Sequence, residues 1–514
     1  MKNNRRSLTK LDIALLGSGL AVTSVLSIGN MTRWSVWFDE AFSAMIVRHS
    51  FIDIARYTAN DVHPPLYYWL LKLWTMVWGH SPLALRSLSL VLLLVAMTVV
   101  FVFVRRVFGR LAAVVSLLLI SIAPMLIRYS EEARMYTMTL AIVVAATSVL
   151  YEATRRPTRR KWLLYGILVG VGTVTHYMTL IMWASHWLWR WYEVRQVSLR
   201  GQLKAFFSPE WRRALLVTLG VVALWLPLLL WQVINIQGGG FWIGPVSVDT
   251  LSNYLTNLYL YYDHHQVFSW LAVVLLALIA LTGALAPVAY RQLASEEQRG
   301  YRLIISMAFL PPVILMLGSL PPLRPAFVDR YILAAILFWS VWVGITYAIL
   351  LRKSGRQQKL VAGMLAATMV MSVMGIEHVY AIGNYNKDNN SPHTVRTIME
   401  LVDRETMGVE PVVAESSWLF FEVAYYETAK NPTFFRSEDS TKIGAYAMLR
   451  DDAKRKIVNT ELFTKDYDKL WLVVRKDSIP TMSASFNGWR ITRILQTNTK
   501  SSELRAVEMR RSGV

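Results

Sequence analysis

Cysteine is absent from the 514 residues of this chain, and charged residues are scarce. Without cysteine, the chain can form neither a disulfide framework nor a thiolate metal site. Only 17% of the residues are charged, whereas 54% are hydrophobic and the mean hydropathy is +0.36. This apolar surface exceeds what a soluble fold of this length buries, so the composition predicts an integral membrane protein.

The formal net charge of +20 would by itself suggest binding to nucleic acid. Its distribution argues against that function. Residues before Glu377 hold 34 Lys and Arg against 15 Asp and Glu, and 25 of these basic residues lie in six short clusters between hydrophobic runs. Such clusters are typical of cytoplasmic loops in membrane proteins. We therefore expect the lipid bilayer as a partner, and no nucleic acid.

Long uncharged runs recur before residue 380, and a helix of roughly 17 to 25 residues crosses a bilayer. The run at 13–30 lacks a convincing small-residue cleavage site, so we interpret it as a span and not as a signal peptide. The run at 162–189 is too long for one span and has basic clusters on both sides, which predicts two spans turning near His176. The other predicted spans are 87–104, 111–127, 135–151, 214–234, 266–290, 303–323, 331–351 and 360–376.

These runs predict a polytopic α-helical membrane protein with about eleven transmembrane helices. A cytoplasmic N-terminus places all six basic clusters on the cytoplasmic side. We expect the transmembrane domain to be residues 1–380 and a small soluble domain to be residues 381–514 on the extracytoplasmic side. In that domain, the apolar segments 411–414 and 470–474 predict buried strands and 417–430 predicts a helix, which suggests an α/β fold. Its composition favours a packing or acceptor-docking role.

Two adjacent carboxylates, Asp39 and Glu40, follow the first predicted span and lie among aromatic residues. A carboxylate that is partly desolvated at the membrane boundary holds its proton more tightly, and it can serve as a general base or a metal ligand. The alternative is that one of the two only caps a helix that starts at Ala41. The pair alone leaves both interpretations open.

Other segments at the predicted outer face also combine charged and aromatic side chains. Two prolines after His63 hold this residue at the start of an aromatic helix. Arg86 precedes the second span on the side where the positive-inside rule disfavours Arg, which indicates an anionic partner. The polar segments 128–136 and 324–331 contribute Glu131, Glu132, Arg134, Tyr136, Asp329, Arg330 and Tyr331.

In chain order, these residues resemble the protein O-mannosyltransferase and aminoarabinose transferase group of the GT-C superfamily, which are polyprenyl-phosphate-sugar glycosyltransferases. The resemblance covers roughly residues 1–380. It rests on the acidic pair at Asp39, the Asp-Val-His-Pro-Pro-Leu segment from Asp61, Arg86 in Ala-Leu-Arg-Ser-Leu, the Glu-Glu-Ala-Arg-Met-Tyr turn, and the Asp-Arg-Tyr segment from Asp329.

The resemblance implies an inverting transfer in which Asp39, with Glu40 beside it, deprotonates an acceptor hydroxyl while polyprenyl phosphate leaves. The departing phosphate needs cations, and the candidates are Arg86, Arg134 and Arg330. The residues expected around the sugar and acceptor are His63, Glu131, Glu132, Tyr136, His176, Asp329 and Tyr331. No ligand spacing identifies a metal, so a divalent ion held by Asp39 and Glu132 stays an open alternative.

The mannosyltransferases with the Asp-Val-His-Pro-Pro segment carry a large β-trefoil insertion, whereas residues 235–266 form only a short Gly-rich loop here. We therefore expect a bacterial or archaeal enzyme of the cell envelope. It would transfer a hexosyl, mannosyl or pentosyl group to a lipid, a cell-wall glycan or a protein at the outer face of the plasma membrane.

Two other functions share some of these features. A secondary transporter would usually show internal repeats with broken helices, and the sequence has no repeated segment. A non-catalytic lipid-binding scaffold of the envelope would bind the donor lipid whether or not Asp39 carries a carboxylate.

Overall fold

The computed structural model describes residues 7–235, 243–261, 269–352, 354–382, 394–436, 444–450, 454–496 and 503–512. The chain divides into two compact units. One, the helical unit, consists of Met1–Gly29, Arg86–Pro227 and Gly240–Ala381. The other, the mixed unit, consists of Asn30–Leu85, Leu228–Gly239 and Ile382–Val514. The segment that follows the first long helix thus belongs to the same compact unit as the C-terminal residues.

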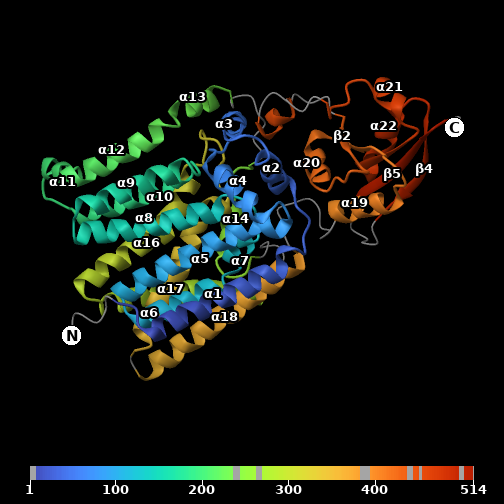
Figure 1. Ribbon diagram of the computed structural model, residues 1–514. Helices are drawn as coiled ribbons and strands as arrows, with labels where there is room; N and C mark the ends of the chain where they lie inside the picture. The colour runs from blue at the N-terminus through green and yellow to red at the C-terminus, as the bar shows by residue number, and fades with distance from the viewer. Residues whose placement is uncertain are drawn as a thin grey trace. The chain divides into compact units, whose positions relative to one another are not determined.

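The helical unit is built from long helices and short connections (Figure 1). Its elements are α1 (Lys10–Met31), α5 (Pro82–Val107), α6 (Arg110–Ser121), α7 (Pro124–Ser130), α8 (Tyr136–Arg155), α9 (Arg159–Thr173), α10 (Thr179–Glu193), α11 (Leu199–Phe206), α12 (Pro209–Ala223), α14 (Val248–Asn257), α15 (Ser269–Tyr290), α16 (Ser295–Leu317), the 3-10 helix η3 (Asp329–Ile332), α17 (Leu333–Leu350) and α18 (Arg356–Ile382).

Among the residues that the structure describes, seven helices are long and apolar enough to cross a membrane. They are Lys10–Met31, Pro82–Val107, Tyr136–Arg155, Trp270–Tyr290, Ser295–Leu317, Asp329–Leu350 and Arg356–Ala381. Two helix pairs, α6 with α7 and α12 with α13 (Leu226–Asn235), pass the same test together, which gives up to nine spans. The chain is therefore a mostly helical protein with several membrane-spanning helices.

Both helix pairs are bent where a proline follows the break. The angle is 61° between α6 and α7, where Pro124 begins α7, and 64° between α12 and α13, where Pro227 is the second residue of α13. Proline has no backbone N–H to bond to the preceding turn, so it is tolerated in the first turn of a helix but not in its interior, and a new helix begins at or next to each proline. The sequence runs 111–127 and 214–234, expected as single spans, are thus broken helices.

The run 162–189 forms two helices, α9 and α10, and the turn between them contains His176, as expected. Each helix has only 15 residues, which is shorter than the roughly 17 residues needed to cross the hydrocarbon core. The total of eleven spans therefore stays a prediction. In the loop 235–266, residues 236–242 and 262–266 lie outside the described residues, and α14 lies between them.

The core of the helical unit is α17, because every one of its side chains is buried. It packs against α6, α15 and α16, and Figure 1 shows α8, α16 and α17 running alongside one another. At the contact with α6, a Cβ atom on Gly344 would lie 2.6 Å from Cα of Ser116 and 2.8 Å from its backbone nitrogen. The absence of a side chain at Gly344 is what lets the two backbones approach this closely.

An ion cluster around the buried Asp12 joins α1 to α5 and α6, with the side chain of Arg105 buried and that of Arg110 40% exposed. Asp12 is fully buried, and it accepts hydrogen bonds from Nε of Arg105 at 2.9 Å and Nε of Arg110 at 2.7 Å. Thr9 donates a further bond from its hydroxyl to the same carboxylate. A buried charge is tolerated when it is paired in this way.

The mixed unit combines short helices with a five-stranded sheet. Its helices are α2 (Phe38–Ile46), α3 (Phe51–Ala59), α4 (Leu66–Trp78), α13, α19 (Thr394–Glu405), α20 (Ser417–Tyr425), α21 (Thr460–Phe463) and α22 (Ile479–Ala484), with 3-10 helices η4 (Gly444–Arg450), η5 (Thr464–Asp466) and η6 (Lys476–Ser478). Its strands are β1 (Val412–Ala414), β2 (Thr433–Phe435), β3 (Lys469–Arg475), β4 (Trp489–Leu495) and β5 (Leu504–Arg511).

The strand order is β2-β1-β3-β5-β4. Strand β1 is parallel to β2 and β3, whereas β5 is antiparallel to β3 and β4. Alternate residues of the central strands, among them Val413, Leu472 and Val507, share one apolar core cluster with Met482 of α22 and with Phe486. Helices α19 and α20 contact β5 and β1. The period of two along each strand explains why one face of the sheet forms this core.

A polar network links the interior strands β3 and β5 of this sheet. Lys469 lies 3.1 Å from Oε2 of Glu410 and 3.2 Å from Oε2 of Glu508. Burial raises the pKa of Glu508, but hydrogen bonds from Arg510, Thr492 and Lys469 outweigh it and hold the pKa below its ordinary value.

The close approach of α6 and α17 leads to a prediction about stability. In Gly344→Ala, the new Cβ would overlap backbone atoms of Ser116, so we expect a loss of about 1–3 kcal/mol of stability. The measurement is the thermal unfolding midpoint in detergent. The matched control is Gly363→Ala in α18, where no other heavy atom of the described residues lies within 4 Å of the new Cβ. Equal midpoints for the two variants would contradict the packing argument.

Candidate active site

The polar turn between α7 and α8 is buried in the helical unit. Arg128, Glu131, Glu132 and Arg134 each expose 6% or less of their surface. Arg128 donates a hydrogen bond of 2.6 Å from Nη2 to Oε2 of Glu132, four residues later. The hydroxyl of Ser89 in α5 donates to the carbonyl oxygen of Glu132 at 2.6 Å. The turn is thus fixed by its own ion pair and by a neighbouring helix.

Arg86 lies in α5, three residues before Ser89. Residues three apart lie on one face of a helix. Ser89 contacts the backbone of Glu132 and, at 3.5 Å, the carbonyl oxygen of Arg134. Arg86 therefore lies on the face of α5 that meets the polar turn, and its side chain is only 3% exposed.

Aromatic rings from three distant segments meet beside this turn. The ring centroid of Tyr136 lies 5.4 Å from Tyr129, 6.2 Å from His176 and 6.4 Å from Tyr331. His176 and Tyr331 lie 5.0 Å apart. The guanidinium of Arg330 lies 5.8 Å from the ring centroids of both Tyr136 and Tyr331. The fold brings the predicted residues 136, 176, 330 and 331 into one cluster.

Charge is concentrated in the same cluster. Arg134 and Arg330 both act electrostatically on buried His176, and Tyr261 acts on Arg128. Asp329, in η3 beside Arg330, accepts a hydrogen bond from Nδ2 of Asn257 in α14. Buried arginines keep their charge and offer several N–H donors, so a desolvated group of them suits a phosphate or another anion.

Asp39 and Glu40 lie in the mixed unit, in the first turn of α2. Helix α2 begins at Phe38 and its N-cap is Trp37, so neither carboxylate caps a helix starting at Ala41. The alternative interpretation of the pair as a helix cap is therefore wrong. Asp39 is partly exposed and Glu40 is buried.

His63 also lies in the mixed unit and is 8% exposed. The buried side chain of Gln232 holds its loop, because Nε2 donates to the carbonyl oxygens of Thr58 at 2.6 Å and Asp61 at 2.8 Å. The next helix, α4, begins at Leu66 after the two prolines. The prolines and the amide of Gln232 thus fix the backbone on both sides of His63.

The structure places the site residues predicted from the sequence in two sets. The helical unit brings together Glu131, Glu132, Arg134, Tyr136, His176, Asp329, Arg330 and Tyr331, with Arg86 on the adjoining face of α5. The mixed unit contains Asp39, Glu40 and His63. Within the described ranges, no three His, Asp or Glu side chains are grouped so that they could hold a metal ion.

Sequence reasoning placed Arg128 and Tyr129 in the polar segment 128–136 without giving them a role, and it missed Asn257 and Tyr261. Arg128 had a detectable signal, because its spacing of four residues from Glu132 is that of a helical ion pair. Asn257 had none, because its contact with Asp329 joins residues 72 positions apart. Tyr261 has a positive φ of 53°, a conformation that side-chain identity alone does not indicate.

Comparisons with known proteins bear on the function of these residues. Residues 62–231 match the family described as dolichyl-phosphate-mannose-protein mannosyltransferase. No curated protein sequence matches the chain. Among solved structures, ArnT from Cupriavidus metallidurans in the apo state has a TM-score of 0.62 at 12% identity, with 97% of each chain covered.

Two further structures have a similar fold. ArnT from the same organism bound to undecaprenyl phosphate has a TM-score of 0.60 at 12% identity, with 98% of each chain covered. The oligosaccharyltransferase of Archaeoglobus fulgidus has a TM-score of 0.53 at 13% identity, and the match covers 92% of this chain and 71% of that one. The predicted resemblance to the GT-C superfamily of glycosyltransferases is thereby confirmed, and the chain has the fold of a multi-pass membrane protein of that superfamily.

Proposed function

We propose that this chain is an inverting glycosyltransferase that moves a sugar from a polyprenyl-phosphate donor to a hydroxyl group of an acceptor. The observation that carries the proposal is the buried cluster of Arg128, Arg134 and Arg330 with aromatic side chains. It occurs in a fold shared with ArnT, for which a complex with undecaprenyl phosphate is known. Burying several arginines is costly in a membrane protein, so a functional anion is the best reason for their presence.

In the proposed reaction, the acceptor oxygen forms a bond to the anomeric carbon of the sugar while the bond from that carbon to the phosphate oxygen breaks. The electron pair of the broken bond leaves with the polyprenyl phosphate. Asp39, with Glu40 beside it, takes the proton of the acceptor hydroxyl. A single displacement of this kind inverts the anomeric configuration. The carboxylate supplies general-base catalysis, which typically raises a reaction rate roughly 10²–10⁴-fold.

Arg86, Arg134 and Arg330 are assigned to the departing phosphate. Negative charge develops on its oxygens as the bond to the sugar breaks, and cations held in a water-poor site stabilise that charge strongly. Arginine suits this role because its planar guanidinium can donate two parallel hydrogen bonds to a phosphate. The ion pair of Arg128 with Glu132 fixes the turn from which Arg134 extends.

The remaining residues are assigned to the sugar and the acceptor. Tyr136, His176 and Tyr331 supply ring faces against which the apolar side of a sugar ring can pack. The side chains of His63, Glu131, Glu132 and Asp329 can accept hydrogen bonds from sugar hydroxyls.

We propose a topology with a cytoplasmic N-terminus and with residues 381–514 on the outer side of the plasma membrane. The six basic clusters support this orientation, because Lys and Arg accumulate in cytoplasmic loops. The reaction would then take place at the outer face, on a lipid, a glycan or a protein of a prokaryotic envelope. The transferred group would be a hexosyl, mannosyl or pentosyl residue.

The donor and the acceptor can be identified together. Mass spectrometry of envelope lipids, glycans and proteins from cells with and without the gene should show one sugar modification that is lost with the gene. A transporter would instead give substrate flux in liposomes without a lipid-linked sugar, and that result would contradict the proposal.

Replacement of the proposed base gives a direct test. We expect Asp39→Asn to lower sugar transfer at least about 100-fold, because the amide cannot accept the proton. The measurement is the transfer rate from the lipid-linked sugar fraction of the producing cells. The matched control is Asp53→Asn, since Asp53 is a surface carboxylate of the same segment, in the first turn of α3. Full activity in Asp39→Asn would refute the assignment.

Replacement of a proposed phosphate ligand should weaken donor binding. Loss of a charged hydrogen bond is worth about 1.5–3 kcal/mol, so we expect Arg330→Gln to bind undecaprenyl phosphate roughly 10–100-fold more weakly. Calorimetry with undecaprenyl phosphate in detergent measures the affinity. Arg324→Gln is the matched control, because Arg324 is exposed six residues earlier whereas Arg330 is buried. Equal losses in the two variants would contradict a specific role for Arg330.

A further inference from the structure

The C-terminal residues of the mixed unit hold the backbone of residues 30–85 at several points. The guanidinium of Arg396 in α19 donates to the carbonyl oxygens of Thr32 at 2.8 Å and Arg33 at 3.1 Å. The backbone N–H of Gly444 donates to the carbonyl oxygen of Asn60 at 2.7 Å. These bonds join parts of the chain more than 350 residues apart, and they are made to backbone groups of the early segment.

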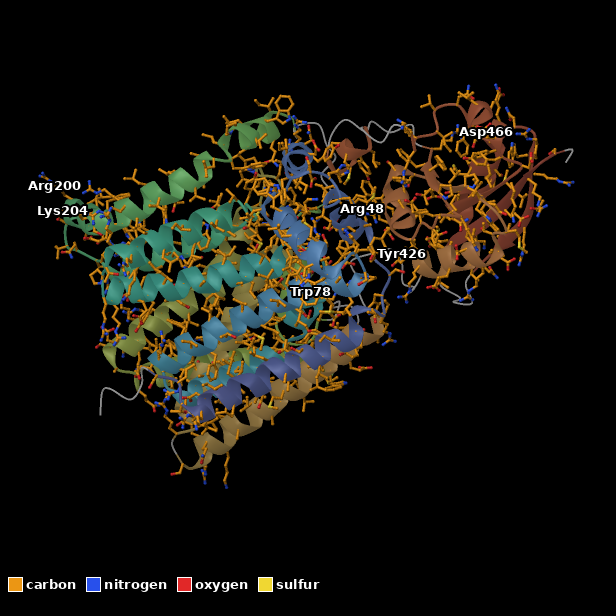
Figure 2. The ribbon with its side chains drawn as sticks, in the orientation of Figure 1. Arg48, Trp78, Arg200, Lys204, Tyr426 and Asp466 are labelled. Carbon is orange, nitrogen blue, oxygen red and sulfur yellow. The ribbon has the colours of Figure 1, made fainter. Side chains whose placement is uncertain are left out.

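Two tyrosines at the C-terminal end of α20 add to these contacts. The hydroxyl of Tyr426 accepts a hydrogen bond of 2.7 Å from the N–H of Val36. Tyr425 donates its hydroxyl to the carbonyl oxygen of His80 at 2.8 Å. Tyr426, the residue that follows α20, is labelled in Figure 2. Val36 is buried, and a buried N–H needs an acceptor, so Tyr426 fixes the backbone two residues before α2 begins.

Phe38, the first residue of α2, contacts three aromatic rings. The ring of Phe38 stacks on Trp418 of α20 at 5.7 Å and 13°, and it meets Phe421 edge-on at 5.2 Å. The ring centroid of Tyr446 in η4 lies 6.0 Å from that of Phe38. Helices α2 and α20 lie side by side in Figure 1 and contact each other. One ring is thus fixed by three aromatic partners, all from the C-terminal part of the chain.

Asp39 is the residue that follows Phe38. Within one helical turn the backbone is rigid, so whatever fixes the ring of Phe38 and the amide of Val36 also fixes the Cα–Cβ bond from which the carboxylate of Asp39 extends. The position of a base matters greatly, because a displacement of about 1 Å can lower a rate about 100-fold. The C-terminal domain therefore does more than pack against the rest of the chain.

We infer that the C-terminal domain is a positioning element for the catalytic carboxylate, acting through the stacking of Phe38 on Trp418 and the hydrogen bond from Val36 to Tyr426. Phe38, Trp418 and Tyr426 are positioning residues that act through Asp39. This inference rests on the proposed function, since it deepens the role of the carboxylate in α2.

The position of α2 can be measured without any substrate. The chain has no native cysteine, so spin labels can be attached to Arg48→Cys, at the end of α2, and to Met407→Cys, in the C-terminal domain. Met407 is 93% exposed, and Arg48 is exposed and labelled in Figure 2. Pulsed electron paramagnetic resonance on the full chain in detergent should give one narrow distance distribution. Phe38→Ala should broaden it.

A matched variant separates positioning from general weakening of the domain. Phe463 packs on the core cluster of the sheet and meets Phe434 edge-on, with ring centroids 4.9 Å apart. Phe463→Ala removes a ring of the same kind, and we expect it to leave the distance distribution narrow. Tyr426→Phe provides a milder second variant, because it keeps the ring and removes only the oxygen that accepts from Val36.

The kinetic arm uses the lipid-linked sugar fraction of the producing cells as donor. We expect Phe38→Ala to lower kcat at least about tenfold with the donor KM changed less than twofold, because the base is displaced and the phosphate site is not. Trp418→Phe, which keeps a stacking ring, should recover most of kcat relative to Trp418→Ala. A narrow distribution and an unchanged kcat in both Phe38→Ala and Tyr426→Phe would overturn the inference.

The two proposals can fail separately. If Asp39→Asn keeps its activity, Asp39 is not the base. The positioning role is then refuted as well, because it depends on that base, and the measured spin-label distances do not change this conclusion. If Asp39→Asn is inactive but Phe38→Ala and Tyr426→Phe change neither distance nor kcat, only the positioning role is overturned.

Discussion

The cost of burying charge is the constraint on which this structure depends. A charge placed in the apolar interior is tolerated only where an opposite charge or several hydrogen bonds compensate for lost hydration. Asp12 meets this condition through Arg105 and Arg110, and it thereby joins α1 to α5 and α6. Arg128 and Glu132 meet it in the turn between α7 and α8. The cluster around Asp12 stabilises the packing of helices. The ion pair of Arg128 with Glu132 fixes the polar turn between α7 and α8.

The same constraint explains why breaks in the helices coincide with the candidate site. Pro124 ends the run of α6, and the short helix α7 that follows leads directly into the polar turn. The turn between α9 and α10 brings His176 to Tyr331, and η3 brings Arg330 to Tyr136. Continuous helices satisfy their own backbone groups, so polar side chains that must meet one another gather where helices end. The site is assembled from these ends.

Much of the helical unit could be predicted from the sequence, because apolar runs and basic clusters are local signals. The runs around 87–104, 135–151 and 331–351 correspond to the long helices α5, α8 and α17. The segments 411–414 and 470–474 correspond to β1 and β3. The bends at Pro124 and Pro227 were not predicted, because a hydropathy run does not register a change of direction. Asn257 and Tyr261 were not predicted either, because they reach the site through the fold and not through a local pattern.

The sequence by itself determined the class of the protein, the outline of its spans and the residue types of its site, because hydrophobicity, charge and motif order are properties of the chain. Only the tertiary structure decided that α2 begins at Phe38, so that Asp39 is not a helix cap. It also decided that residues 30–85 form one compact unit with residues 382–514. The physical reason is that rings as distant as Phe38 and Trp418 stack only after folding has joined the two ends of the chain.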